Sequence, residues 1–233
     1  MGEGKGKIKI IKNGPYMVTG GMKLHEKLIT PKGMGYIYED GRALPQAQTY
    51  ALCRCGKSKT PPFCDGAHVH AHFDGTETAS KEPFESRAQH LEGPALELLD
   101  DNRCAFARFC HTERGDAWEL TLRSDNPECK RLAIQAATEC PAGRLVIIDK
   151  ATGQVIEPEY EPAIEVLQDP ARHVSGGLFV KGGIPIESAD GELYEVRNRV
   201  VLCRCGHSRN KPFCDSMHVM KSYSDQRRGW FKR

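Results

Sequence analysis

Eight cysteine and histidine residues fall into two sets with the same spacing, which is the pattern of a metal site built twice. In each set, two cysteines are separated by one residue, a third cysteine follows nine positions later, and a histidine follows after four more. Three thiolates and one imidazole suit zinc or an iron–sulfur centre, and spacing alone leaves both open. The two sets are Cys53, Cys55, Cys64 and His68, and Cys203, Cys205, Cys214 and His218.

The residues around the ligands are repeated with them. The first set lies in CRCGKSKTPPFCDGAH and the second, 150 positions later, in CRCGHSRNKPFCDSMH, with ten of sixteen positions identical. The repeat extends upstream, because residues 8–24 parallel residues 164–180. We therefore expect a module in which a strand, a turn, a Gly-Gly bend and a second strand precede a longer loop. A last strand, at residues 49–52 and 199–202, leads into the first cysteine.

Several residues between the ligands favour a loop that closes around a metal. Pro62 and Phe63 stiffen and shield the approach to the third cysteine, and Gly56 lets the backbone pass close to sulfur. We expect Asp65 to cap a short helix that carries the histidine and to orient its ring. We expect Ser58 to donate a hydrogen bond to a cluster sulfide.

The pattern C-x-C-x2-S-x3-P-F-C-D-G-A-H resembles the signature of the CDGSH iron–sulfur proteins, the mitoNEET family. The resemblance implies one [2Fe-2S] cluster in each motif, held by the three cysteines and the histidine. The second copy departs from it at Ser216 and Met217, where the first has Gly66 and Ala67, so a positive φ is not predicted there. A zinc knuckle with the same four ligands is the alternative.

The segment between the modules contains three further cysteines in a second pattern. Cys104, Cys110 and Cys140, which precedes a proline, resemble three of the ligands of half a bacterial ferredoxin, and Ala107 stands where another cysteine would be. The resemblance is to divergent single-cluster ferredoxin-like domains. Three thiolates fit a [3Fe-4S] cluster, because a cubane needs a ligand at each of four irons.

The fourth ligand of a cubane remains an alternative at this point. Cys129 shares an apolar helical face with Leu132 and Ala136, so we expect it in the core. A [4Fe-4S] cluster would instead use Cys129, His111 or water, and buried cysteines without metal are a further alternative. The predicted elements here are a polar connector (70–93), strands (96–99 and 117–122), a helix started by Asp125 or Asn126 (127–139), a hairpin (145–156) and a linker (157–162).

Composition limits the functional classes. The net charge is +2, so no overall basic surface for nucleic acid or anionic lipid is predicted, and basic residues gather only at the two ends, where we expect solvated termini. No apolar run reaches about 18 residues, and residues 1–30 lack a secretory signal. We therefore expect a soluble, cytoplasmic protein whose thiols are ligands rather than disulfides.

Glycine and proline together make 37 of 233 residues, which favours turns and short strands. The predicted fold is β-rich α+β: two CDGSH β modules form an intramolecular pseudo-dimer, and a small ferredoxin-like α+β domain is inserted between them. The predicted domains are residues 1–93 (first module and connector), 94–162 (ferredoxin-like) and 163–233 (second module). The resemblance implies strand exchange between the modules, which would leave the protein a monomer.

The predicted function is electron transfer through two [2Fe-2S] clusters and a central [3Fe-4S] or [4Fe-4S] cluster. The partner would be an unidentified redox protein or an apo-acceptor protein. No nucleophile with its base, P-loop or dinucleotide-binding fingerprint is present, so an electron-transfer protein is predicted rather than an enzyme. Cluster storage or donation, redox or pH sensing, and a zinc-stabilised interaction module are the alternatives.

Overall fold

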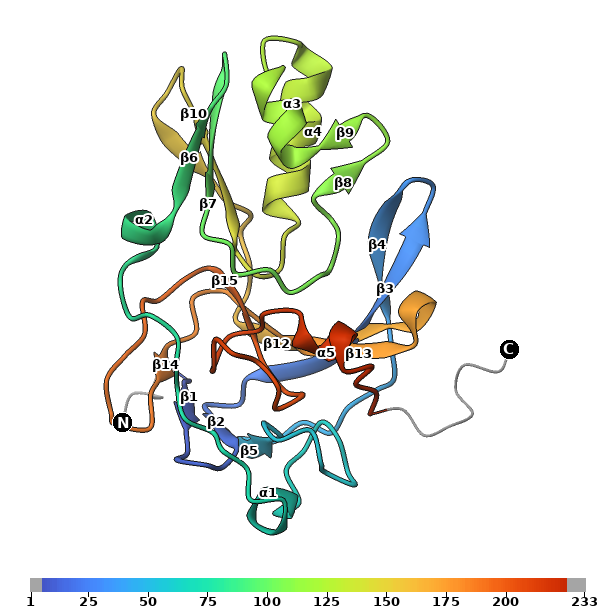
Figure 1. Cartoon of the computed structure of the whole chain (residues 1–233), viewed down its shortest axis with the longest axis vertical. Helices are drawn as coiled ribbons and strands as arrows, with labels where there is room; N and C mark the ends of the chain where they lie inside the picture. Colours follow the sequence, from blue (N-terminus) through green and yellow to red (C-terminus); the bar gives the residue numbers. More distant parts are fainter. Residues whose placement is uncertain (1–5, 226–233) are drawn as a thin grey trace.

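The computed structural model describes residues 6–225, so the basic residues at the C-terminal end lie outside the described part. Two β-sheets form the lower half of the molecule in Figure 1. The first sheet has the order β14-β1-β2-β5. Buried and more exposed side chains alternate along β2, so that Tyr16 and Val18 point into the core. Its strands are β1 Ile8–Ile10, β2 Tyr16–Thr19, β5 Thr49–Leu52 and β14 Ile186–Glu187.

The second sheet has the order β15-β13-β12-β3-β4 and is covered on both faces. Ile164 and Val166 belong to a core shared with the first sheet, whereas Leu167 and Phe179 belong to a core that faces the middle segment. This double burial explains why all seven residues of β12 are buried, the polar Glu165, Gln168 and Asp169 included, instead of every second one. Its strands are β3 Lys23–Lys32, β4 Gly35–Asp40, β12 Ala163–Asp169, β13 Val174–Lys181 and β15 Arg199–Leu202.

Each of these sheets combines strands from both repeats. Strands β1, β2 and β5 come from the first repeat, and β14 of the second repeat pairs parallel with β1, with Ile186 opposite Ile8. Strands β12, β13 and β15 come from the second repeat, and β3 of the first pairs parallel with β12, with Lys23 opposite Ala163. The first repeat therefore contributes β3 and β4 to the second sheet, and the second repeat contributes β14 to the first sheet.

The middle segment forms the upper part of the molecule in Figure 1. Its sheet has the order β11-β10-β7-β6, and the helices pack on it through a core that includes Leu98, Ala133 and Ile147. The longest helix begins at the cap Asn126, whose side chain accepts from the N–H groups of Glu128 and Cys129. The elements are α2 Phe84–Arg87, β6 Gln89–Glu92, β7 Leu96–Asp100, β8 His111–Thr112, β9 Gly115–Asp116, α3 Ala117–Leu122, α4 Pro127–Thr138, β10 Leu145–Asp149 and β11 Gln154–Ile156.

Three local predictions were wrong. Residues 117–122 form α3 rather than a strand, because Asp116 caps it by accepting from the N–H of Glu119. Gly177 lies inside β13 rather than in a bend, and a Cβ there would come within 2.4 Å of Val201. The connector is shorter than expected, since α2 and β6 occupy its last residues.

Short helices follow the last cysteine of each motif: α1 Ala67–His70 and α5 Met217–Met220. A single 3-10 turn, η1 Pro170–Arg172, joins β12 to β13. Within residues 6–225, no helix has both the length and the apolar character needed to cross a membrane. The prediction of a β-rich fold with mixed helix and strand content is confirmed.

Candidate metal centres

The first ligand set is placed by the end of β5. Cys53 directly follows this strand, and its N–H donates to the carbonyl of Pro62 (2.8 Å), while the N–H of Cys64 donates back to the carbonyl of Ala51 (2.9 Å). Leu52 and Phe63 pair across the same turn as an isolated β-bridge. The loop between the second and third cysteines is therefore closed by backbone hydrogen bonds.

The second ligand set is built in the same way at the end of β15. The N–H of Cys203 donates to Pro212 (2.8 Å), the N–H of Cys214 donates to Val201 (2.8 Å), and Leu202 pairs with Phe213. Two copies with different intervening residues thus reach one backbone geometry.

The four ligands of each motif are arranged as two pairs. The sulfurs of Cys53 and Cys55 are 3.7 Å apart, and the Sγ of Cys64 is 3.5 Å from the Nδ1 of His68. The same separations in the second motif are 3.6 Å between Cys203 and Cys205 and 3.5 Å between Cys214 and His218. Tetrahedral ligands at about 2.3 Å for sulfur and about 2.0–2.1 Å for nitrogen stand roughly 3.5–3.8 Å apart. Each pair therefore has the spacing of two ligands on one metal ion.

The pairs do not combine into a four-ligand site for a single ion. Among residues 6–225, no three histidine, cysteine, aspartate or glutamate groups are placed to hold one metal together. A zinc knuckle needs all four ligands around one ion, whereas a [2Fe-2S] cluster needs two at each of two irons. The donor set and its pairing therefore fit the binuclear cluster.

Hydrogen bonds prepare the first thiol of each pair to act as a thiolate ligand. The pKa of Cys53 is lowered to about 6, because its sulfur accepts hydrogen bonds from the thiol of Cys55 and from backbone N–H groups, including that of Ser58, which outweigh its burial. The pKa of Cys203 is lowered to about 6 by the matching contacts in the second motif. Amide-to-sulfur hydrogen bonds also remain available when a metal is bound.

The serine and aspartate that occur in both motifs have roles other than those expected. The Oγ of Ser58 donates to the carbonyl of Phe63 (2.6 Å), and Ser208 donates to Phe213 (2.7 Å). The Oδ2 of Asp65 accepts from the N–H of Lys59 (2.7 Å), and its Oδ1 accepts from the N–H of Ala67. These side chains therefore hold the loop, and the cap residue of α1 is Gly66.

The position where the second motif departs from the family pattern keeps the same backbone. Gly66 has a φ of 84° and Ser216 has a φ of 68°, so both are left-handed. The absence of glycine did not prevent this conformation, contrary to the expectation from sequence. Both histidines are thereby carried on an equivalent turn.

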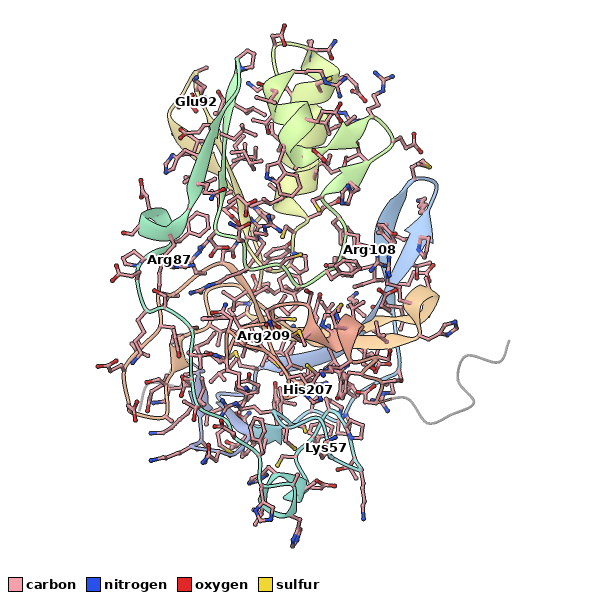
Figure 2. The ribbon with its side chains drawn as sticks, in the orientation of Figure 1. Lys57, Arg87, Glu92, Arg108, His207 and Arg209 are labelled. Atoms are coloured by element: carbon pink, nitrogen blue, oxygen red, sulfur yellow. The ribbon has the colours of Figure 1, made fainter. Side chains whose placement is uncertain are left out.

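The two motifs contact each other through the main chain at one cysteine ligand of each. Cys55 and Cys205 form an antiparallel β-bridge, and a Cβ on Gly56 would lie 2.5 Å from the carbonyl oxygen of Cys205. Only glycine tolerates this approach together with the positive φ found there. Lys57 and His207, which follow the two glycines, lie close together at this junction in Figure 2.

The motifs differ in exposure. In the second, all four ligands are buried, and His218 is only 4% exposed. In the first, Cys64 and His68 are partly exposed. His68 also borders an open hollow with Lys12, His72 and Phe73. The first site is therefore the more exposed of the two.

Three of the four cysteines of the middle segment line one small cavity. Cys104, Cys110 and Cys140 all border it, together with Trp118, and Cys129 is not part of its wall. Cys129 instead lies in the core of α4, as predicted, and His111 is exposed. Burial raises the pKa of Cys110 to about 12, and the neighbouring thiols of Cys140 and Cys104 add to this.

The loop before Cys110 has an unusual backbone. Phe106 and Arg108 both have positive φ, 59° and 68°, alternating with ordinary residues. Such alternation turns successive N–H groups toward one side and creates a concavity typical of anion and iron–sulfur sites. The N–H of Phe106 already donates to the Sγ of Cys104 (3.3 Å). The thiols and the backbone thus fit an anionic cluster in this cavity.

This loop packs on the second motif. Ala105, Ala107 and Phe109 share a buried core with Cys214, and the guanidinium of Arg103 lies 4.3 Å above the ring of Phe213. In Figure 1 the helix of the second motif, α5, lies between the middle segment and the helix of the first motif, α1. The second motif therefore lies between the other two candidate centres.

Comparison with protein families decides the kind of domain. Residues 13–69 and 175–219 match the family described as iron-binding zinc finger CDGSH type. The chain carries two CDGSH domains. Such domains bind iron–sulfur clusters, typically [2Fe-2S], and each matched segment contains one complete set of the predicted ligands. Comparisons with curated proteins and with solved structures gave no match.

One pair of residues in the CDGSH domains was not predicted from the sequence. Arg54 and Arg204 stand between the first two cysteines of each motif and are buried, at 2% and 1% exposure. The sequence signal for their importance is that arginine occupies this position in both copies of the repeat. A buried guanidinium beside a metal site sets the local charge, because burial of an ion is tolerated only with compensating contacts.

Proposed function

We propose that the protein transfers electrons through a [2Fe-2S] cluster in each CDGSH domain. The observation that carries the proposal is the pairing of ligands in both motifs. Two cysteine sulfurs form one pair, a cysteine sulfur and a histidine nitrogen form the other, and the two atoms of each pair are separated as two ligands of one tetrahedral metal ion would be. A [2Fe-2S] cluster supplies one-electron redox chemistry when bound. The chain supplies rigid loops that hold its ligands without rearrangement.

The histidine ligand sets the range of potentials. His68 and His218 replace a thiolate by a neutral imidazole, so each site is less negative than one with four cysteines. We expect potentials above the roughly −400 mV of plant-type clusters and toward those of Rieske centres. The partner would be a redox protein with a potential in that interval.

We also propose that the two CDGSH domains form an intramolecular pseudo-dimer. The reciprocal parallel pairing of β14 with β1 and of β3 with β12 supports it, as does the bridge between Cys55 and Cys205. A monomeric chain would then have the two-site arrangement that other proteins reach by dimerisation.

The third part of the proposal is a [3Fe-4S] cluster in the middle segment, held by Cys104, Cys110 and Cys140. The shared cavity and the concave backbone at Phe106 and Arg108 support it. Each thiolate of such a cluster binds a different iron, so the three sulfurs need not touch one another.

Anaerobic purification followed by iron and sulfide analysis tests these assignments. We expect a coloured protein with about seven irons per chain, from two [2Fe-2S] clusters and one [3Fe-4S] cluster. A colourless protein with two zinc ions would contradict the electron-transfer proposal. Eight irons per chain would contradict only the three-thiolate assignment. Four irons per chain would contradict the central cluster but agree with the two CDGSH clusters.

Cluster donation is the second candidate, and the exposure of the first site favours it. Because His68 borders an open hollow, an acceptor protein can reach this ligand. A carrier should cycle between redox states without losing iron, whereas a donor should transfer its cluster to an apo-ferredoxin. Rapid transfer from the wild type that is abolished by His68→Cys would favour donation.

A further inference from the structure

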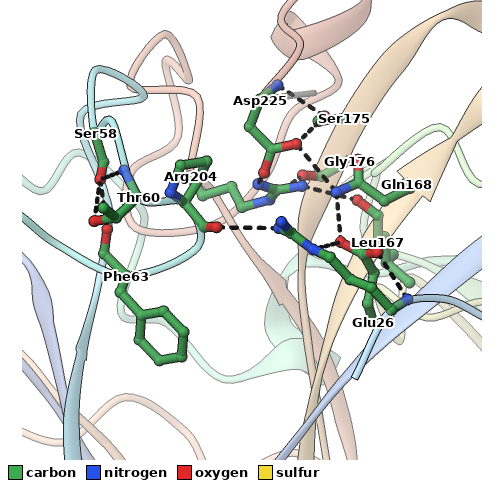
Figure 3. Close-up of polar contacts among 12 residues, drawn as sticks. Glu26, Ser58, Thr60, Phe63, Leu167, Gln168, Ser175, Gly176, Arg204 and Asp225 are labelled. Atoms are coloured by element: carbon green, nitrogen blue, oxygen red, sulfur yellow. Dashed lines mark hydrogen bonds and ion pairs between the residues drawn. The ribbon is translucent and has the colours of Figure 1, made fainter. Parts of the chain in front are cut away.

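The buried arginines of the two CDGSH motifs have different partners. Arg204 of the second motif donates from Nε to the carbonyl of Gly176 (2.7 Å) and from Nη2 to the carbonyl of Leu167 (3.0 Å). Its third contact is an ion pair with Asp225, whose side chain is only 3% exposed. Figure 3 shows this guanidinium directed at the carboxylate.

Asp225 is held in position by neutral donors. Its Oδ1 accepts from the Oγ of Ser175 (2.7 Å) and from the Nε2 of Gln168 (3.1 Å), as Figure 3 shows. Burial alone would raise the pKa of Asp225, but the charge of Arg204 and these hydrogen bonds keep it below the usual value. The carboxylate is therefore ionised and neutralises Arg204.

Arg54 of the first motif has no such neutralising partner. Its guanidinium donates to the carbonyls of Ile11 (3.0 Å), Gly14 (3.3 Å) and Gly75 (2.8 Å). Gly75 stands 150 positions before Asp225, the same offset that relates the ligands. In residues 6–225, no carboxylate lies within ion-pair distance of Arg54.

The nearby carboxylate of Glu77 is committed elsewhere. The charge of Glu77 contributes to raising the pKa of Tyr16, the ring on which Arg54 stacks. The carboxylate oxygens of Glu77, however, accept hydrogen bonds from the N–H of Ala189 (2.8 Å) and the hydroxyl of Tyr194 (2.6 Å). The first motif therefore contains a buried positive charge between its first two ligands that the second motif neutralises.

We propose that this difference makes the two CDGSH sites unequal in reduction potential, with Asp225 as the residue that lowers the potential of the second. The inference rests on the proposed [2Fe-2S] clusters. Reduction adds one negative charge, which an uncompensated guanidinium stabilises and a neutral ion pair does not. A single electron given to the protein then resides mainly at the first, exposed site. Greater solvent access at that site acts in the same direction, so only a change at Asp225 isolates the charge effect.

The test is a redox titration of the loaded wild-type protein followed by absorption and electron paramagnetic resonance. His68→Cys and His218→Cys each change the signal of their own site, so they serve only to assign the wild-type signals, and the potentials are taken from proteins that keep both histidines. In the wild type we expect the first site to be reduced before the second. Asp225→Asn keeps the size and most hydrogen bonds of the side chain but removes its charge. It should raise the ratio of reduced to oxidised second site on the order of tenfold at a fixed solution potential, which is about 59 mV for one electron.

Asp74→Asn is the matched control. Asp74 is an exposed acid next to Gly75, where solvent screens its charge, so we expect both potentials to stay unchanged. A second variant, Arg54→Gln, removes the uncompensated charge and should lower the potential of the first site, which keeps the test decisive if Asp225→Asn does not load.

Two outcomes would overturn the inference while leaving the proposed function intact: both sites titrate together, or the second is reduced first. An unchanged second potential in a loaded Asp225→Asn protein would also overturn it. A protein without [2Fe-2S] absorption would instead contradict the proposed function itself, and iron and sulfide analysis of the same sample separates these cases.

Discussion

At the residue scale, Ser216 shows how the second motif keeps its geometry without the family glycine. Its φ of 68° is costly for a residue with a side chain, by about 1–2 kcal/mol. At the matching Gly66, a Cβ would meet nothing within 4 Å, so a side chain there would add backbone strain without a clash.

The paired substitutions Gly66→Ala and Ser216→Gly should therefore shift stability in opposite directions. We expect Gly66→Ala to lower the free energy of unfolding by about 1 kcal/mol and Ser216→Gly to raise it by up to about 1 kcal/mol. Urea unfolding of the loaded protein, followed by cluster absorption, measures both. Equal effects of the same sign would show that the φ at this turn does not control its stability.

The two histidines should also differ in their response to acid. Burial lowers the pKa of His218 to about 4, so its ring stays neutral as pH falls toward that value. The side chain of His68 is partly exposed, so solvent reaches this ligand. Because protonation competes with metal binding, we expect the first cluster to be lost at a higher pH than the second.

Absorption of the visible bands during stepwise acidification from pH 7 to pH 4 checks this order. His68→Cys should abolish the early loss, and His218→Cys should affect only the later one, since thiolate replaces the ring that gains a proton. Each change should also lower the potential of its own site. Unchanged decay and potential in both variants would mean that these histidines are not ligands.

At the scale of elements, Arg199 connects β15 to the helix that precedes Cys140. Its Nη1 donates to the carbonyls of Ala137 (2.8 Å), Thr138 (2.9 Å) and Cys140 (2.7 Å), at the C-terminal end of α4. A guanidinium suits these carbonyls, which have no partner within the helix, and the negative end of its dipole. Glu157 neutralises the buried charge.

Replacing Arg199 should therefore affect both stability and the central site. We expect Arg199→Met to lower the free energy of unfolding by about 3–5 kcal/mol, because it leaves buried carbonyls and Glu157 without their partner. The variant should lose central-cluster iron first, since Cys140 is held by the same contacts. Arg131→Ala on the exposed face of α4 is the control and should change stability by less than about 1 kcal/mol. Denaturant unfolding and iron analysis measure both effects.

The ligands of the central cluster can be tested one by one. Cys129 is in the α4 core and Cys110 lines the cavity, so Cys129→Ala should keep the central cluster and Cys110→Ala should abolish it. An oxidised [3Fe-4S] centre is paramagnetic and an oxidised [4Fe-4S] centre with charge +2 is silent, so electron paramagnetic resonance of the isolated protein reads the result. Loss of the signal in Cys129→Ala would assign Cys129 as a ligand.

Some elements could be predicted from sequence and others could not. The strands before each first cysteine and the helix capped by Asn126 follow from local signals and were predicted correctly. Helix α3 differs from the prediction because Trp118, Leu120 and Leu122 alternate as in a strand, whereas the cap at Asp116, which accepts from the N–H of Glu119, starts a helix. The buried roles of Arg54 and Arg204 depend on partners far away in sequence, which no local pattern reveals.

At the scale of the whole molecule, the spatial order of the candidate sites was also beyond the sequence. The ligand spacings predicted each site separately. The loop at Phe109 packs against Cys214 only because the second sheet also buries the face that it turns toward the middle segment. The pairing of β3 with β12 joins residues about 140 positions apart. Such long-range pairing is decided by which apolar faces remain uncovered after the local elements form.

The bridge between Cys55 and Cys205 has a consequence for how the protein is made. The first motif is complete in sequence by residue 68, yet the edge strand of its sheet comes from residues 186–187 and its neighbouring loop from residue 205. During synthesis, the ligands of the first motif therefore lack these neighbours until residues 186–205 have been made. We expect iron and sulfide to be inserted only after that point, and a chain arrested in the middle segment to leave the first four ligands open to oxidation and to the wrong metal.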